Sequence, residues 1–210
     1  MSWLTIFILF CFVLIYLHIF IHFKVNIYNE FSLLDDINRV SIADTIDHKL
    51  PFIFDGSGII QPYDLSQCSQ HSQRSIFKKN IYLKTYDPIL ILEPFVTFFT
   101  KDLLYKLKKG KHIKLHHNPE CRNFYMVHSG KVIVYCIHPS YKQHIQNDKF
   151  EEFIENNSKI LRVEMSANQI LFLPNYWFIF TKAIEKSVVE KLQYSTVLNQ
   201  INIYSDKVYG

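Results

Sequence analysis

The sequence predicts a mainly β domain of the α+β class, rolled into a barrel or jelly roll, with a transmembrane helix in front of it. The first observation is an uncharged apolar run at the start of the chain. The second is a series of short apolar segments separated by turn residues. Of the 210 residues, about 185 follow the run, enough for one hydrophobic core and too few for two. We therefore expect a transmembrane signal-anchor over residues 1–24 and one domain over residues 25–210.

The apolar run extends from Trp3 to Phe23 and contains no Asp, Glu, Lys or Arg. A helix of this length just crosses a hydrocarbon core of about 30 Å. The run lacks the basic start and small-residue cleavage site of a secretory signal, so we expect a retained membrane anchor. His18 and His22 share one face of its last turns, where snorkelling to the interface is favoured over a proton or metal role. Lys24 follows directly and predicts a single-pass protein with its bulk in the cytoplasm.

Charge and cysteine content narrow the classes of function. The net charge of +4 is too small to identify a partner, and the four cysteines show neither a disulfide framework nor a CxxC metal motif. Nucleic acid is not expected as a partner, because arginine is scarce and no nucleic-acid motif is present. A basic run is interpreted as a solvated helix face, with binding of anionic lipid headgroups as the alternative. Its members are Lys101, Lys106, Lys108, Lys109, Lys111 and Lys114.

The part of the chain before residue 111 has mixed secondary-structure signals. An aspartate is a suitable N-cap for the first predicted helix, and Gly56 follows the first predicted strand as a turn residue. Gly110 is placed as the C-cap of the second predicted helix. Residues 24–34 are expected to be extended. We then expect a helix from Asp35 or Asp36 to Asp47, a strand over Lys49–Phe54, a polar loop over 64–75, a strand over Ile81–Tyr86 and a helix over Phe95–Lys109.

After residue 110 the pattern changes to strands. Ser129-Gly130 is typical of a hairpin turn, and Ser140–Asn157 is a charged insert with helical character. The predicted strands are Lys111–His116, Asn123–His128, Lys131–His138, Lys159–Met165, Gln169–Leu173, Tyr176–Thr181 and Val188–Tyr204.

Three of these segments resemble one family. Asn123–Pro139, with its Asn-aromatic strand, Gly-Lys turn and final Pro, resembles the hairpin of cupin-like JmjC domains. Asn168–Trp177 resembles the strand of that family that ends in Ile-Pro-x-x-Trp, and Leu50–Phe54 resembles its early Lys-Pro strand. The resemblance implies a double-stranded β-helix. A hydrophobic anchor before such a small domain also resembles uncharacterised membrane proteins of large DNA viruses.

Active members of the family are 2-oxoglutarate oxygenases, which hold ferrous iron through a His-x-Asp pair and a distal His. The resemblance places the pair on His116-His117-Asn118, where an amide stands for the carboxylate, and the distal ligand on Ile179. These degenerate positions are the candidate metal site. The resemblance also implies Asn123 and Lys131 as candidate cofactor-binding residues, although Lys131 stands one residue before the usual position of the keto-acid lysine.

The combined expectation is a membrane-anchored binding or scaffolding module without an iron site, catalytic residues or cofactor. Its expected partners are the lipid bilayer and a protein at the membrane. The alternative is an Fe(II)- and 2-oxoglutarate-dependent hydroxylase that uses His116 or His117 with Asn118 and a ligand supplied from elsewhere. A third interpretation is a virion or organelle membrane component whose barrel serves protein contacts. The histidines of this region also allow a zinc site, because His112 and His116 would share a strand face. The favoured interpretation is that these histidines are scattered and bind no metal.

Overall fold

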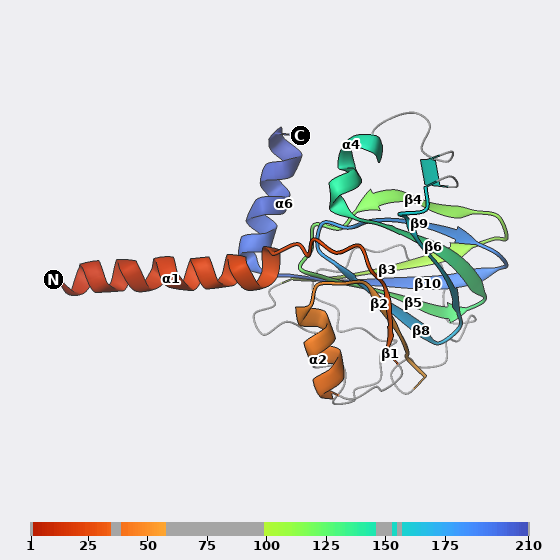
Figure 1. The fold of residues 1–210 in the computed structure, drawn as a ribbon, viewed down its shortest axis with the longest axis horizontal. Coiled ribbons are helices and arrows are strands. Elements are labelled where there is room, and N and C mark those ends of the chain that lie inside the picture. Colours follow the sequence, from red (N-terminus) through yellow and green to blue (C-terminus); the bar gives the residue numbers. More distant parts are fainter. Residues whose placement is uncertain (1, 35–38, 58–98, 146–152, 155–156, 210) are drawn as a thin grey trace.

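The computed structural model describes residues 2–34, 39–57, 99–145, 153–154 and 157–209. Figure 1 shows a β-rich body from which helix α1 (Trp3–Phe23) projects on one side. Helix α6 (Val197–Tyr209) lies on the same side, where α1 joins the body, and helix α2 (Arg39–Asp47) lies below. The described part of the chain is therefore mainly β with an apolar N-terminal helix, which confirms the coarse prediction.

The strands form two sheets. The larger sheet has the order β1-β2-β8-β5-β10-β3, and the smaller has the order β4-β9-β6-β7. Every described pairing is antiparallel except the parallel pair of β1 with β2. The strands of the larger sheet are β1 (Ser32–Leu34), β2 (Phe52–Asp55), β3 (Phe99–Leu107), β5 (Arg122–Ser129), β8 (Gln169–Pro174) and β10 (Ser187–Ser195). Those of the smaller sheet are β4 (His112–His117), β6 (Lys131–Ile137), β7 (Leu161–Ser166) and β9 (Phe178–Ala183).

Three apolar clusters hold the body together. One lies between the two sheets and includes Tyr125, Trp177 and Ile179. A second joins the outer face of the larger sheet to α2 and contains Phe172, whose ring packs 5.0 Å from that of Phe52. The third covers the outer face of the smaller sheet, beside the 3-10 turn Pro139–Tyr141 and helix α4 (Lys142–Ile145). Every residue of β10 is buried, since β10 is central and both faces of its sheet are covered.

Most strand predictions are confirmed. The structure contains the predicted β2, β4, β5, β6, β7, β8 and β9, as well as the short helix α2, with boundaries that differ by a few residues. Gly130 occupies the hairpin turn with a φ of 79°. The predicted strand Ile81–Tyr86 and the polar loop at 64–75 lie outside the described residues.

The predicted helix Phe95–Lys109 is wrong, because its described part is strand β3 from Phe99 to Leu107. Its apolar residues fit helical spacing, but all nine residues of β3 lie opposite residues of β10. Pairing with a central strand outweighs a local helical pattern. The predicted helix face that would carry the basic run is therefore not formed. Three of its lysines, Lys106, Lys108 and Lys109, are exposed at the end of β3 and in the turn that follows.

The predicted strand Val188–Tyr204 is only half right. It ends as β10 at Ser195, and α6 follows. The hydroxyl oxygen of Thr196 accepts a hydrogen bond from the backbone N–H of Asn199 at 3.2 Å, as a helix N-cap does. This cap ends the extended conformation, and the apolar residues that follow take helical spacing.

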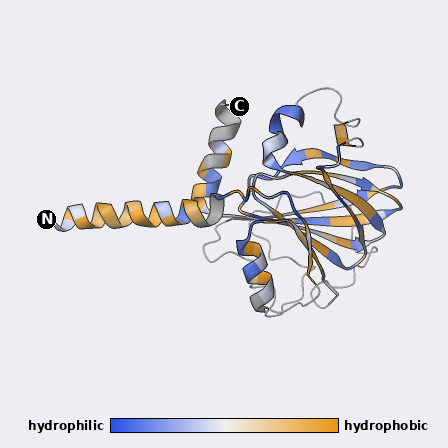
Figure 2. Cartoon of the chain, in the orientation of Figure 1, coloured by the Kyte–Doolittle hydropathy of each residue, from blue (hydrophilic) through white to orange (hydrophobic). Residues whose placement is uncertain are grey.

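Helix α1 is 21 residues long, and its window Trp3–Phe20 is apolar enough to cross a membrane or to be a signal sequence. Figure 2 shows it as a nearly continuous hydrophobic rod that projects from the body. No residue of this window is buried inside the protein; Trp3, for example, is 88% exposed and Phe12 is 65% exposed. Near the other end, His18 Nε2 lies 2.9 Å from the hydroxyl of Thr196, which connects α1 to the first turn of α6.

Candidate functional site

The structure brings the three candidate metal positions together between the two sheets. Strand β4 pairs with β9 so that His116 lies directly opposite Ile179. Asn118 follows β4 and is completely buried; its backbone N–H and its side-chain Nδ2 both donate to the carbonyl of Trp177, at 3.1 and 3.0 Å. His116, Asn118 and Ile179 therefore surround one position, whereas His117 does not join them.

A β-bulge separates the histidines of β4. The register of β4 against β9 shifts by one residue between Ile113 and His116. An extra residue in one strand reverses which face the following side chains occupy. His112 is exposed and packs against the ring of Phe180, whereas His116 contacts Tyr125 in the interior. The expectation that His112 and His116 share a strand face is therefore wrong.

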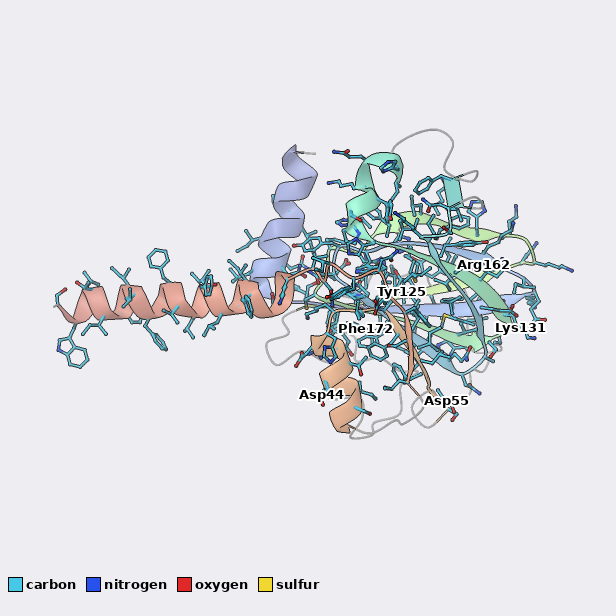
Figure 3. The ribbon with its side chains drawn as sticks, in the orientation of Figure 1. Asp44, Asp55, Tyr125, Lys131, Arg162 and Phe172 are labelled. Atoms are coloured by element: carbon cyan, nitrogen blue, oxygen red, sulfur yellow. The ribbon has the colours of Figure 1, made fainter. Side chains whose placement is uncertain are left out.

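The hydroxyl of Tyr125 lies between His116 and Asn118. Tyr125 is on β5 with 1% exposure, and Figure 3 places it inside the body. Its oxygen is 2.9 Å from His116 Nε2 and 2.6 Å from Asn118 Oδ1. Asn118 Nδ2 donates to a carbonyl, so the atom that faces Tyr125 is the oxygen Oδ1, which only accepts. The Tyr125 hydroxyl therefore donates its proton to Asn118 Oδ1.

The other contact of Tyr125 depends on the protonation of His116. Nδ1 of His116 lies 2.9 Å from the carbonyl oxygen of Lys114, and Nε2 lies 2.9 Å from the oxygen of Tyr125, whose own proton is donated to Asn118. Both ring nitrogens therefore face acceptors. Burial, followed by the nearby charge of Lys191, lowers the pKa of His116 to about 4. His116 is therefore neutral near pH 7 and carries a single ring proton, which is donated to one of these two oxygens at a time. In the unfolded chain the pKa is 6.5, so this group contributes a rise in stability as the pH increases from about 4 to 6.5.

The residues present do not fit ferrous iron. A first-row metal lies about 2.0–2.2 Å from its nitrogen and oxygen ligands, so an ion between His116 and Asn118 would have to displace the Tyr125 hydroxyl. It would gain one imidazole and one neutral amide, while Ile179 offers no ligand atom. Within the described ranges, no group of three His, Cys, Asp or Glu side chains is placed to hold a metal.

Lys191 is a charged residue of this interior that sequence reasoning missed. It lies on β10 with 3% exposure, and its Nζ is 5.4 Å from the centroid of the Tyr125 ring. Burial lowers the pKa of Lys191 to about 7, with an opposing contribution from Glu120. The signal was present, because the adjacent charges of Glu190 and Lys191 fall on opposite faces of a predicted strand. Glu190 points to the opposite face and is 2.5 Å from His128 Nε2.

The remaining candidate residues lie elsewhere. His117 packs against the rings of Tyr176 and Phe178, at 5.8 and 4.9 Å. Asn123 is buried near the start of β5, where its Oδ1 accepts from Gln193 at 3.0 Å. Lys131 is exposed and follows the turn at the other end of β5, which is about 20 Å away at about 3.3 Å per residue. The two proposed cofactor-binding residues are therefore not brought together.

A groove of about 800 Å³ lies on the outer face of the smaller sheet. Its cationic lining residues come from three places: Lys109 beside the β3–β4 turn, Arg162 on β7 and Lys182 on β9. Apolar lining is supplied by Ile133 and Tyr135 of β6, and also by Ile154, Ile160 and Ile184. Among the described lining residues there is no carboxylate. The groove therefore combines positive charge with apolar surface.

No family model and no curated protein matches the chain. Among solved structures, a conserved protein of unknown function from Streptococcus pyogenes is similar to part of it, with 12% sequence identity and a TM-score of 0.34. The match covers 46% of this chain and 64% of that protein.

Proposed function

We propose that this chain is a membrane-anchored binding module with a jelly-roll domain, related to the cupin and JmjC proteins, in which a tyrosine hydroxyl stands where the active relatives hold iron. The observation that carries the proposal is the bridge from His116 through Tyr125 to Asn118, with Ile179 opposite His116. A hydroxyl of the protein occupies the position of the iron, and two of the three iron ligands are replaced by Asn118 and Ile179. This arrangement favours a binding function over iron-dependent catalysis.

The strand pairing supports the jelly roll. From β3 onward the strands pair as first with last and second with second-last: β3 with β10, β4 with β9, β5 with β8 and β6 with β7. Such nesting is expected when one long hairpin is rolled into two facing sheets of four strands, and β1 and β2 then extend one of these sheets.

Restoring the ligand set is the test of the filled site. We expect the wild-type chain in an uncharged detergent to bind no Fe(II) at micromolar concentration under anaerobic calorimetry. The triple variant Y125F/N118D/I179H is expected to bind Fe(II) more than about 100-fold more tightly, because it offers two imidazoles and a carboxylate around a vacated position. Adding H116A to the triple variant should abolish this binding. Wild-type binding of iron and 2-oxoglutarate that each require the other would overturn the proposal and support the hydroxylase.

The groove on the smaller sheet is the proposed binding site of the module. The described side chains between the sheets pack into one apolar cluster, so we place the ligand on the outer face, where the groove lies. A volume of about 800 Å³ is typical of small-molecule sites, and Lys109, Arg162 and Lys182 favour an anion whose apolar part contacts Tyr135. In Figure 3, Arg162 lies on the side of the body away from α1. The ligand is therefore expected from the aqueous phase rather than from the anchoring bilayer.

Phenyl phosphate combines an anion with an aromatic ring and serves as the probe. We expect calorimetry to detect saturable binding to the full chain, and R162Q or K182Q to weaken it about tenfold or more, since a hydrogen bond to a charged group contributes about 1.5–3 kcal/mol. K131Q is the matched control, because Lys131 is exposed on the same sheet but does not line the groove. Equal loss in K131Q, or no effect of R162Q and K182Q, would contradict this site.

A further inference from the structure

We infer that α6 lies flat on the membrane surface, with the apolar stripe formed by Val197, Ile201 and Tyr204 in contact with lipid. The inference rests on the proposed function, in that α1 must cross the bilayer. It adds a second contact between the protein and the membrane, made by an element that follows the domain in the chain.

The exposed face of α6 is apolar. Val197, Ile201 and Tyr204 are 42%, 58% and 73% exposed. Their spacing of four and three residues places them on one side of a helix. These side chains therefore form an exposed apolar stripe along α6.

The opposite face of α6 carries a buried polar residue. Asn199 has 0% exposure, and its side-chain Nδ2 donates to the carbonyl of Pro119 at 2.6 Å. A surface helix of a soluble protein has the reverse arrangement, with its apolar stripe toward the core and its polar residues in water. The reversal in α6 is expected if the medium outside the helix is apolar.

The direction of α6 relative to α1 fits a membrane surface. Figure 1 shows α6 on the same side of the body as α1 and transverse to it. The hydrogen bond between His18 Nε2 and the hydroxyl of Thr196 fixes the start of α6 against α1. A helix transverse to a membrane-spanning helix lies parallel to the plane of the bilayer, which is the orientation that contact between the stripe and lipid requires.

The depth of α6 agrees with that of known interfacial helices. His18 stands five residues before the end of α1 at Phe23, which is about 7.5 Å along a helix. Interfacial helices bury their apolar face about 5–10 Å into the boundary between headgroups and acyl chains. Tyr204 has a polar tip on an aromatic ring, a side chain enriched at this boundary.

Quenching of tryptophan fluorescence by brominated lipids tests the inference on the full chain in phosphatidylcholine vesicles. The W3F/I201W variant places an indole on the stripe, and W3F/K131W places one on the exposed far end of the hairpin. Trp177 is completely buried in both and serves as an internal reference. We expect at least about twofold quenching of the indole introduced by I201W with lipids brominated near the headgroup, as for a helix buried about 5–10 Å. The indole introduced by K131W should not be quenched.

Wild-type Trp3 separates the two possible failures. Trp3 lies at the start of α1 and should be quenched if α1 is inserted. Quenching of Trp3 without quenching of the I201W indole would overturn the interfacial position of α6 and leave the anchor intact. Absence of Trp3 quenching would overturn the membrane anchor itself, and with it the premise of the inference.

Discussion

Replacing Gly130 with alanine is expected to destabilise the protein by about 2–5 kcal/mol. Gly130 has a φ of 79°, a left-handed conformation that costs an L-residue about 1–2 kcal/mol. An added Cβ would also lie 2.8 Å from Cα of Ser187 and closer still to the carbonyl oxygen of Lys186. Both are backbone atoms of the neighbouring turn, so relieving the overlap requires a backbone shift that costs about 1–3 kcal/mol more.

Gly110 supplies the matched control for this prediction. Its φ is 77°, but an added Cβ would meet no atom within 4 Å. We therefore expect Gly110→Ala to cost only the conformational term of about 1–2 kcal/mol. Urea unfolding of both variants, followed by near-ultraviolet circular dichroism in detergent, measures the difference. If Gly130→Ala and Gly110→Ala destabilise the protein equally, the backbone of residues 184–187 does not approach Gly130 as closely as described.

Replacing Lys191 with methionine is expected to stabilise the protein by about 2–4 kcal/mol at pH 7. Methionine retains the apolar length of the side chain and removes a charge that is buried beside the ring of Tyr125. Folding lowers the pKa of Lys191 from 10.5 to about 7, mainly through burial. This difference corresponds to about 4 kcal/mol at neutral pH, at about 1.36 kcal/mol per pKa unit.

The same substitution is expected to change how stability depends on pH. Between pH 7 and pH 10.5 the unfolded chain holds the Lys191 proton and the folded chain does not, so wild-type stability should rise with pH. The contribution is about 2 kcal/mol from pH 7 to 9, and it should be absent in K191M. K131M is the control, because Lys131 is exposed and its loss should leave the rise unchanged. A rise of the same size in K191M would contradict the assignment to Lys191.

Local patterns predicted much of the β region. The hairpin of β5 and β6 was predicted because apolar strands flank Ser129-Gly130, a turn whose left-handed residue has to be glycine. The convergence of His116, Asn118 and Ile179 followed from their resemblance to motifs of known order. These features depend on a few neighbouring residues, and the sequence contains them directly.

Features that depend on distant partners could not be predicted in this way. Strand β3 has residues that fit a helix, and only its pairing with β10 determines its conformation. The bulge in β4 changes which face His116 occupies, yet it leaves no distinctive residue in the sequence. The bridge of Tyr125 between His116 and Asn118 depends on how β5 packs against the end of β4.

The nested pairing of the strands has a consequence for biosynthesis. Ser187 lies opposite Leu107 and Ser195 lies opposite Phe99, so the partners in β3 and β10 are separated by 80 to 96 residues. Contacts between such distant residues form slowly, and β10 is the last strand of the two sheets to leave the ribosome. Until it arrives, the edges of β3 and β5 that it will join are open to pairing with other chains.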